Sequence, residues 1–240
     1  MFNLEDKYAL VTGSTDGLGK RIIIQLAKQG VNLIIHGRND DKVDDFVNYL
    51  KLQFPNILVQ SIICDFNHPN SIQGAFSKLN KLDILINNAG VWLEGDTIDA
   101  KHEQMLELIN VNLAAPILVI RTLLPVLQKS PFAQILNIVS IAGVEIPAGF
   151  YHTTYSATKF GLQAFSEAMA KEFENKNLRV MGYYPGGMET NLFKKSGQDY
   201  KQHEPWMFDP QESVEAILFM LTRDKKINIK RMDLINHLQA

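Results

Sequence analysis

The sequence alternates short apolar runs with longer segments of helical periodicity, and this alternation limits the folds that the chain can adopt. Several runs consist almost entirely of Val, Ile and Leu, which is typical of strands buried on both faces of a sheet. Helical patterns lie between them, for example at Gly17–Gln29, Asp40–Phe54 and Tyr155–Asn175. The predicted strands are Tyr8–Thr12, Val31–His36, Ile57–Ile63, Leu82–Asn87, Gln134–Ser140, Leu178–Tyr184 and, as a last candidate, Arg231–Asn236.

Strands that alternate with helices predict an α/β protein with a doubly wound parallel sheet of about seven strands and helices on both faces, in three layers. No repeat, low-complexity tract or linker interrupts the chain, so we expect residues 1–240 to form a single domain. In such sheets ligands bind beyond the carboxyl ends of the strands, where the strand order reverses. We therefore expect the chemistry directly after the apolar runs.

Composition excludes several classes of partner. A formal net charge of -2 over 240 residues gives no electrostatic reason for binding nucleic acid or an anionic membrane. The lone cysteine, Cys64, rules out an internal disulfide. Neither a secretory signal nor an uninterrupted apolar run of about 18 residues is found, so we expect a cytoplasmic protein without a membrane partner. His203 has no neighbouring ligand residues, and no metal site is predicted.

A glycine-rich turn follows the first predicted strand. Residues 12–19 read TGSTDGLG and lead into a helix. Glycines at such a turn let backbone N–H groups approach a pyrophosphate at the positive end of the helix. The spacing is G-x-x-x-G-x-G rather than the common G-x-G-x-x-G. An ordinary strand–helix turn remains the alternative interpretation.

Tyr155 and Lys159 are four residues apart on a predicted helix, so their side chains share one face. A cation near the phenol lowers its pKa, which would let the tyrosine exchange protons with an alcohol near neutral pH. Ser140 closes a predicted strand at the same edge of the sheet. Asn112 lies in an otherwise apolar helical segment, where a buried amide needs partners and a structural hydrogen bond is the alternative role.

Together with NNAG at residues 87–90 and PGGMET at residues 185–190, these features resemble the short-chain dehydrogenase/reductase family in its compact single-domain branch. The resemblance runs from Lys7 to the helix after Pro210. It implies a Rossmann-type fold and an oxidoreductase that transfers a hydride between a nicotinamide dinucleotide and a small carbonyl or alcohol substrate. A catalytically silent dinucleotide-binding regulator or scaffold is the alternative, and it would not need the catalytic residues.

The resemblance implies a catalytic set of four residues. Tyr155 would be the general acid in reduction and the general base in oxidation. Lys159 would lower the pKa of Tyr155 and hold the nicotinamide ribose. Ser140 would hydrogen-bond the substrate oxygen, and Asn112 would hold a water that links Lys159 to solvent.

The resemblance also implies the cofactor contacts. Three glycines of the turn match the pyrophosphate site, Asp65 matches a residue that meets the adenine amine, and Thr190 matches a residue that contacts the carboxamide. The full implied set is Gly13, Ser14, Asp16, Gly17, Leu18, Gly19, Arg38, Asp65, Asn87, Ala89, Gly90, Tyr155, Lys159, Pro185, Gly186, Met188 and Thr190.

The end of the second predicted strand favours NADP(H) over NAD(H). It reads Ile-His-Gly-Arg at residues 35–38, with no carboxylate where the ribose 2′-hydroxyl would bind. Arg38 can grip a 2′-phosphate with two parallel hydrogen bonds, although a solvated surface charge is its alternative role. Asp16, Asp40 and Asp41 would oppose a phosphate if they pointed inward, but the last two suit the start of the next helix. NADP is the predicted cofactor and NAD the alternative.

Two features concern the substrate and the assembly. Residues 191–208 form a long segment after the PGGMET turn and are predicted to be a substrate lid, whose apolar residues either line a pocket or pack against the domain. Trp92 and Leu93 are candidates for the opposite wall. The helices Ala100–Leu127 and Tyr155–Asn175 carry apolar residues on more than one face, which predicts a homodimer or homotetramer.

Three departures from the family pattern stand out. Ser140 and Tyr155 are separated by 15 positions, with residues 144–152 as an enlarged loop. The C-terminal tail lacks a glycine-rich ending, which leaves the subunit contacts at that end open. Asp16 stands where proteins that bind the cofactor phosphate often carry a base.

Overall fold

The computed structural model describes residues 1–146, 151–201 and 204–237. Its strands are β1 (Tyr8–Val11), β2 (Asn32–Gly37), β3 (Val59–Ile63), β4 (Ile84–Asn87), β5 (Ala133–Ile138), β6 (Leu178–Pro185), β7 (Gly187–Met188), β8 (Met207–Phe208) and β9 (Arg231–Leu234). Its α-helices are α1 (Gly17–Lys28), α2 (Asp40–Gln53), α3 (Ile72–Phe76), α4 (His102–Ile109), α5 (Ala115–Leu127), α6 (Thr153–Glu172), α7 (Leu192–Lys195) and α8 (Pro210–Leu221).

Seven strands form one parallel sheet in the order β3-β2-β1-β4-β5-β6-β9. The chain moves outward from β1 to β3 and then crosses to β4 on the other side of β1, so the strand order reverses between β1 and β4. All seven predicted strands are present, with bounds shifted by one or two residues, and the predicted fold class is confirmed. One shift matters for the site, because β5 ends at Ile138 and Ser140 therefore follows the strand rather than closing it.

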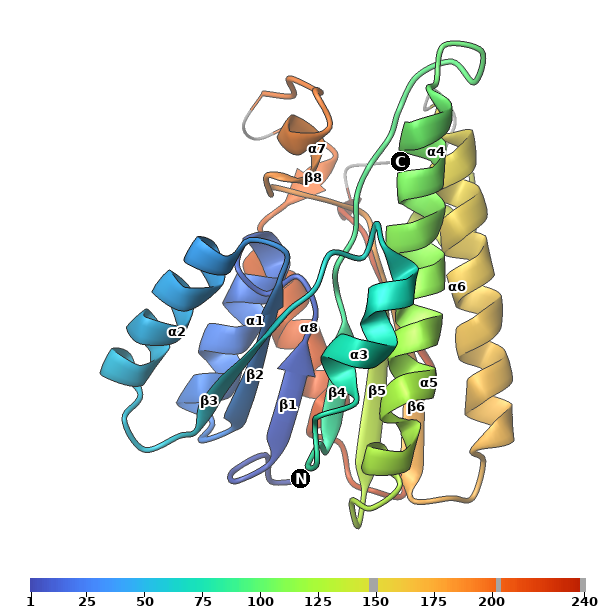
Figure 1. Ribbon diagram of the computed structural model, residues 1–240. Coiled ribbons are helices and arrows are strands. Elements are labelled where there is room, and N and C mark those ends of the chain that lie inside the picture. Colours follow the sequence, from blue (N-terminus) through green and yellow to red (C-terminus); the bar gives the residue numbers. More distant parts are fainter. Residues whose placement is uncertain (147–150, 202–203, 238–240) are drawn as a thin grey trace.

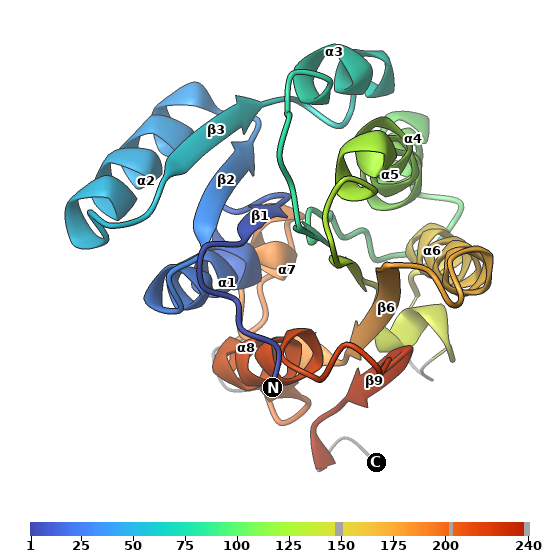
Figure 2. The ribbon, with the colours of Figure 1, turned by 90° about the horizontal axis from the view of Figure 1, so that it is seen from below.

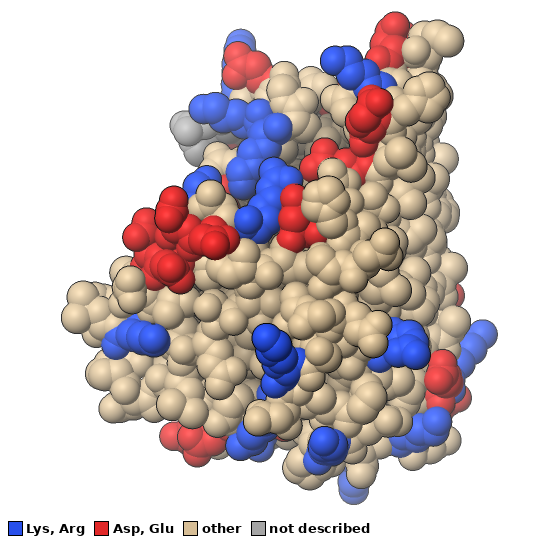
Figure 3. All heavy atoms as spheres, viewed as in Figure 1, with Lys and Arg blue, Asp and Glu red and all other residues tan. Residues whose placement is uncertain are grey.

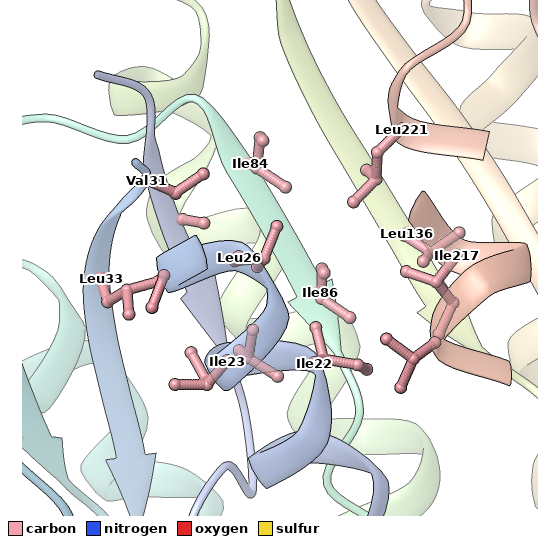
Figure 4. Packing of buried hydrophobic residues seen from close by; sticks show 14 of the residues in the cluster. Ile22, Ile23, Leu26, Val31, Leu33, Ile84, Ile86, Leu136, Ile217 and Leu221 are labelled. Atoms are coloured by element: carbon pink, nitrogen blue, oxygen red, sulfur yellow. The ribbon is translucent and has the colours of Figure 1, made fainter. Parts of the chain in front are cut away.

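Helices cover both faces of the sheet (Figures 1 and 2). The helices α1, α2 and α8 pack on one face, and α3, α5 and α6 pack on the other. Figure 4 shows the face covered by α1, α2 and α8 from close by. Ile22, Ile23 and Leu26 of α1 lie against the sheet there, next to Ile217 of α8. Successive residues of a strand point to opposite faces, which is why strands covered on both sides consist of continuous apolar runs.

The segment predicted as one helix over 100–127 is divided by a single turn of π-helix at 110–114, between α4 and α5. The combined run His102–Leu127 has 26 residues and a mean hydropathy of 1.6, so its length and composition would also suit a membrane span. Core helices of soluble proteins pass the same test, and 39% of the most apolar window is buried inside the protein. The other faces of this run leave apolar side chains at the surface, among them Leu106 and Ile109.

Candidate active site

A cleft with a cavity volume of about 330 Å³ lies at the carboxyl ends of the strands, beside the point where the strand order reverses. Most of the residues predicted from the sequence line it. They are Gly13, Asp16, Gly17, Leu18, Arg38, Asp65, Ala89, Gly90, Ser140, Tyr155, Lys159, Pro185, Gly186, Met188 and Thr190.

Four predicted site residues, Ser14, Gly19, Asn87 and Asn112, do not line this cleft. Ser14 and Asn87 are buried, with Ser14 Oγ accepting a hydrogen bond from His36 N and Asn87 Nδ2 donating one to Asn137 Oδ1. Asn112 is buried as well. Gly19 lies behind the turn.

The glycine turn approaches its neighbours so closely that side chains would not fit. A Cβ on Gly13 would lie 2.9 Å from Ala89 Cα, and Gly13 also has a φ of +62°. A Cβ on Gly19 would lie 2.5 Å from Asn88 Nδ2. The turn therefore presents bare backbone at the N-terminus of the 12-residue helix α1, the arrangement that binds a pyrophosphate. This cradle fits the dinucleotide that the sequence implies.

Asn88 and Thr12 join the turn to β4, and sequence analysis did not identify either as a site residue. Thr12 Oγ1 accepts hydrogen bonds from Asn88 N at 2.9 Å and from Ala89 N at 3.0 Å. Asn88 Nδ2 donates to Thr12 O at 2.9 Å. These bonds hold the ends of β1 and β4 together where the strand order reverses. Thr12 lies in the TGSTDGLG motif and Asn88 in the NNAG motif, so membership of these motifs was the sequence feature that could have identified them as site residues.

His36 is a second residue that sequence analysis missed. Its Nδ1 accepts a hydrogen bond from Gly13 N at 3.0 Å, and its Nε2 donates to Cys64 O at 3.2 Å. Burial lowers the pKa of His36 from 6.5 to about 4, partly opposed by the bond to Cys64 and by Asp65. The neutral ring thus anchors the glycine turn to the ends of β2 and β3. The sequence feature that could have identified His36 is its polar side chain within the apolar run of β2.

This anchor predicts a pH dependence of stability. Below pH 6.5 the unfolded chain protonates His36 while the folded chain does not, so the free energy of unfolding falls as the pH decreases from 6.5 to about 4. The expected loss is about 3 kcal/mol at pH 4. Urea unfolding of wild type and His36→Gln, measured between pH 4 and 7, should show this loss only in the wild type. The exposed residue His102 supplies the control, because His102→Gln should keep the full pH dependence. An identical slope in wild type and His36→Gln would contradict the assignment.

Tyr155, Ser140 and Lys159 converge on the middle of the cleft. Tyr155 forms a side-chain hydrogen bond with Ser140. Lys159 Nζ donates to Ile138 O at 3.2 Å and lies 5.6 Å from the centre of the Tyr155 ring. The helix α6 carries both Tyr155 and Lys159, and the turn after β5 carries Ser140.

The predicted direction of the Tyr155 pKa is wrong in this structure. Burial raises the pKa of Tyr155 to about 12, and the hydrogen bond from Ser140 only partly opposes that rise. Burial also lowers the pKa of Lys159 to about 8. The ammonium points to a backbone carbonyl rather than to the phenol oxygen, so loss of solvation outweighs its attraction for a phenolate.

Asn112 connects the π-helical turn to the segment after β4. Its Oδ1 accepts a hydrogen bond from Val91 N and its Nδ2 donates to Val91 O, both at 2.9 Å. A Cβ on Gly90 would lie 3.4 Å from Asn112 Oδ1 and 4.0 Å from Lys159 Nζ. The structural hydrogen bond foreseen as an alternative is thus present, and the side chain lies close to Lys159.

At the far end of the cleft, Arg38 and Asp65 follow β2 and β3. Arg38 Nη1 lies 3.5 Å from Glu107 Oε1, and 63% of the Arg38 side chain is exposed. Asp65 Oδ1 accepts a hydrogen bond from Asn67 N at 2.9 Å, which shapes the turn after β3. Asn39 rather than an aspartate caps α2, and Asp40 and Asp41 occupy its first turn, as the sequence suggested.

The predicted lid, residues 191–208, lies above the carboxyl ends of the strands, where Figure 1 shows α7 and β8. Some of its apolar residues line the cleft and others pack within the domain, so both of the predicted roles occur. Leu192, Phe193 and Trp206 line the cleft, whereas Met207 and Phe208 form β8 and pair with β7. His203 and part of the enlarged loop over 144–152 lie outside the described residues.

The lid is tied to the glycine turn through Asp16, the N-cap of α1. Lys195 Nζ lies 2.6 Å from Asp16 Oδ2, and Asn191 Nδ2 donates to the same carboxylate at 3.4 Å. Burial opposes the ionised form of Asp16, but the contacts with Lys195, Gly17 and Asn191 together lower its pKa. Asp16 is therefore a paired carboxylate rather than an isolated negative charge beside the cofactor turn.

On the opposite wall, Trp92 lines the cleft but Leu93 does not. Within the part of the chain that the structure describes, no group of three or more His, Cys, Asp or Glu side chains could hold a metal ion. The cleft thus combines a bare backbone turn at a helix N-terminus, a buried tyrosine and a half-buried serine with a nearby ammonium, and an apolar end beside residues 192, 193 and 206.

Comparison with known proteins identifies the family of this chain. Residues 7–201 match the family described as short chain dehydrogenase. An uncharacterized oxidoreductase of Staphylococcus aureus (strain MRSA252) is 28% identical over 229 residues, which cover 95% of this chain and 96% of the relative.

Two solved structures share the fold. An alcohol dehydrogenase from the archaeon Thermococcus sibiricus, complexed with 5-hydroxy-NADP, has a TM-score of 0.87 at 22% identity and covers 98% of this chain and 99% of its own. L-Sorbose reductase from Gluconobacter frateurii, complexed with NADPH and L-sorbose, has a TM-score of 0.85 at 24% identity. The match covers 99% of this chain and 98% of the reductase chain. The family match extends from the start of the sheet into the lid and includes every motif on which the resemblance was based, so this chain belongs to the short chain dehydrogenase family of oxidoreductases.

Proposed function

We propose that this protein transfers a hydride between NADP(H) and the carbonyl or alcohol group of a small molecule, with Tyr155 as general acid and base. The observation that carries the proposal is the convergence of Tyr155, Ser140 and Lys159 in the same cleft as the bare glycine turn. A protein that only bound a dinucleotide would need the turn but not the paired hydroxyls.

The bound nicotinamide supplies the hydride in reduction and accepts it in oxidation. Tyr155 gives its proton to the carbonyl oxygen in reduction, and its pKa of about 12 keeps the phenol protonated at neutral pH. Ser140, which already contacts Tyr155, holds the same oxygen. Lys159 holds the ribose and neutralises charge that develops on Tyr155. Asn112 fixes the segment at Val91 beside Lys159 and holds the water that connects Lys159 to solvent.

The test is NADPH oxidation, followed by absorbance, with a panel of ketones, aldehydes, acyl carriers and steroids. We expect at least one class to be reduced at a rate that depends on the protein concentration. Tight NADPH binding without turnover on any member of the panel would instead support a dinucleotide-binding regulator.

Preference for NADP(H) is supported by charge at the adenosine end of the cleft. Arg38 lines the cleft immediately after β2, at the position suited to a ribose 2′-phosphate. Asp16, which would repel that phosphate, is paired with Lys195. Figure 3 shows Lys and Arg side chains gathered near the carboxyl ends of the strands, beside an acidic group. NAD(H) remains the alternative cofactor.

Arg38→Ala is expected to weaken NADPH binding about tenfold, because a charge-assisted hydrogen bond to phosphate is lost, and to leave NADH binding within twofold. Dissociation constants for both cofactors, measured by fluorescence titration, check this. The exposed residue Arg21, outside the cleft lining, provides a matched control in Arg21→Ala. Tighter NADH than NADPH binding in the wild type would refute the preference.

A homodimer or homotetramer is proposed through α4, α5 and α6. Leu106, Ile109 and Phe160 are 57%, 42% and 37% exposed, and α4 and α6 lie side by side. Burial of such a surface against a second subunit would remove this apolar area from water. A cytoplasmic location is part of the same proposal.

Light scattering at micromolar concentration is expected to give twice or four times the chain mass of 27.1 kDa. The double variant Ile109→Glu/Phe160→Glu should shift this mass to that of a monomer, because two charges would be buried in the interface. Leu52→Glu places the same charge on α2, where Leu52 is 78% exposed, and should leave the assembly intact. A wild-type monomer would exclude the proposed interface.

A further inference from the structure

An aromatic wall surrounds the reacting end of the cleft. Trp92 packs directly on the Tyr155 ring, with the ring centroids 4.4 Å apart. Trp92 also contacts His152 at 5.2 Å and Phe193 at 5.1 Å, both edge to face. Phe193 in turn contacts Trp206 at 5.4 Å. We call Trp92, His152, Phe193 and Trp206 the aromatic wall; all four line the cleft.

The polar atoms behind this wall are bonded away from the cleft. Trp92 Nε1 donates to Glu94 Oε2 at 3.2 Å, and Tyr200 Oη donates to the same oxygen at 2.6 Å. The Tyr200 ring supports Phe193 and Trp206 edge to face, at 5.3 and 5.2 Å. Glu94 and Tyr200 are absent from the described lining of the cleft. Trp92 and Phe193 therefore offer the carbon edges and faces of their rings to a substrate, and Nδ1 of His152 is bonded to Ser156 Oγ at 2.7 Å.

The backbone around Gly187 holds Trp206 in place. A Cβ on Gly187 would overlap Cε3 and Cζ3 of the indole, so the ring lies directly on the backbone of β7. Pairing of Gly187 with Met207 in β7 and β8 fixes the residue after Trp206. The indole is thus positioned before any substrate binds, which reduces the entropic cost of binding against it.

Charge is distributed unevenly along the cleft. Among the described lining residues, the charged side chains are Asp16, Arg38, Asp65, Lys159 and Lys195. Four belong to the cofactor end, and Lys159 is assigned to the ribose. The described part of the substrate end therefore supplies no permanently charged side chain to pair with a carboxylate or phosphate.

We propose that the substrate end of the cleft accepts an uncharged aryl group attached to the reacting carbon, as in an aryl ketone or aryl carbinol. The inference rests on the proposed hydride transfer and adds the substrate class. Hydride from NADPH bonds to the carbonyl carbon, Tyr155 transfers its proton to the oxygen, and the products are the aryl carbinol and NADP⁺. A substrate ring gains edge-to-face contacts with the wall that a saturated ring of similar size lacks.

The probes are acetophenone, cyclohexyl methyl ketone and benzoylformate. The first two differ in aromaticity, and the third adds a carboxylate to the same aryl carbonyl. Because ketones differ in intrinsic reactivity, the decisive quantity is the kcat/KM ratio of acetophenone to cyclohexyl methyl ketone, compared between wild type and variants. Reactivity cancels in that comparison. Phe193→Leu and Trp92→Leu should each reduce the ratio about tenfold.

Phe219→Leu is the control, since Phe219 is exposed on α8 and outside the cleft lining, and its ratio should stay within twofold of wild type. Benzoylformate should have a kcat/KM at least tenfold below that of acetophenone in the wild type. An unchanged ratio in both wall variants, or a preference for benzoylformate or for a ketose, would overturn the proposal.

Binding without turnover separates this proposal from the proposed function. The chain has two tryptophans, Trp92 and Trp206, and both lie in the wall, so intrinsic emission reports on its occupancy. In titrations without cofactor, 1-phenylethanol should bind at least threefold more tightly than 1-cyclohexylethanol. Equal affinities would overturn the aryl assignment even in an active enzyme. Preferential aryl binding in a protein that reduces no ketone would support the aryl site and reject hydride transfer.

Discussion

The Tyr155→Phe variant is expected to bind NADPH nearly as tightly as the wild type while its turnover falls at least about 100-fold, the usual scale of general acid–base assistance. The substitution removes the hydroxyl that gives the proton and leaves the buried ring that packs on Trp92. NADPH oxidation gives the turnover, and fluorescence titration gives the dissociation constant.

Tyr183 provides a matched control for this variant. Its hydroxyl is also buried and burial likewise raises its pKa to about 12, but it bonds Ser213 and lies outside the cleft lining. Tyr183→Phe should therefore keep a turnover within a few-fold of wild type. A tenth or more of the wild-type rate in Tyr155→Phe would show that another group supplies the proton.

The Lys159→Met variant is expected to lose at least about 100-fold in turnover and about tenfold in NADPH affinity, because in the proposed mechanism the ammonium serves both the proton donor and the ribose. Its folded state should nevertheless be more stable. Burial lowers the pKa of Lys159 from 10.5 to about 8, so at pH 7 the charged group costs the folded chain about 3 kcal/mol. Removing this charge should therefore stabilise the folded chain. The substitution also removes the hydrogen bond from Lys159 Nζ to Ile138 O, which lowers the expected gain in stability by about 1 kcal/mol.

The size of this stability change depends on pH. Below pH 8 lysine is charged in both states and the cost is complete, while between pH 8 and 10.5 the folded state sheds its proton and the cost declines. Urea unfolding at pH 7 should therefore show a gain of about 2 kcal/mol for Lys159→Met that shrinks toward pH 10. Lys176→Met, at an exposed position, should show no such gain. A less stable Lys159→Met at pH 7 would mean that the buried charge is better solvated than its surroundings suggest.

Motifs at the ends of apolar runs were sufficient to locate most of the site. Gly13 and Ser140 come two residues after the ends of β1 and β5, and Tyr155 and Lys159 are about one helical turn apart in α6. Parallel strands bring their carboxyl ends to one edge of the sheet, so local patterns of this kind imply a shared location without knowledge of any distance.

Residues that act from behind the cleft were harder to recognise. Ser14, Gly19 and Asn87 belong to the right motifs but do not line the cleft, and His36 lies in the segment at residues 35–38 without being recognised there as an anchor of the turn. A motif records which residue types occur together, whereas the direction of each side chain depends on the elements packed against it. His36 became identifiable only when β2 was placed beside β1 and β3.

The sequence by itself determined the order of the elements and the parallel sheet, because periodicity encodes them, and its resemblance to a known family singled out Tyr155, Lys159 and Ser140. Only the tertiary structure decided the electrostatics of the site. The i, i+4 spacing predicted a lowered pKa for Tyr155, but burial raised it, since solvation depends on the whole enclosing fold. Likewise, the pairing of Asp16 with Lys195 joins residues distant in the chain, and only folding brings them together.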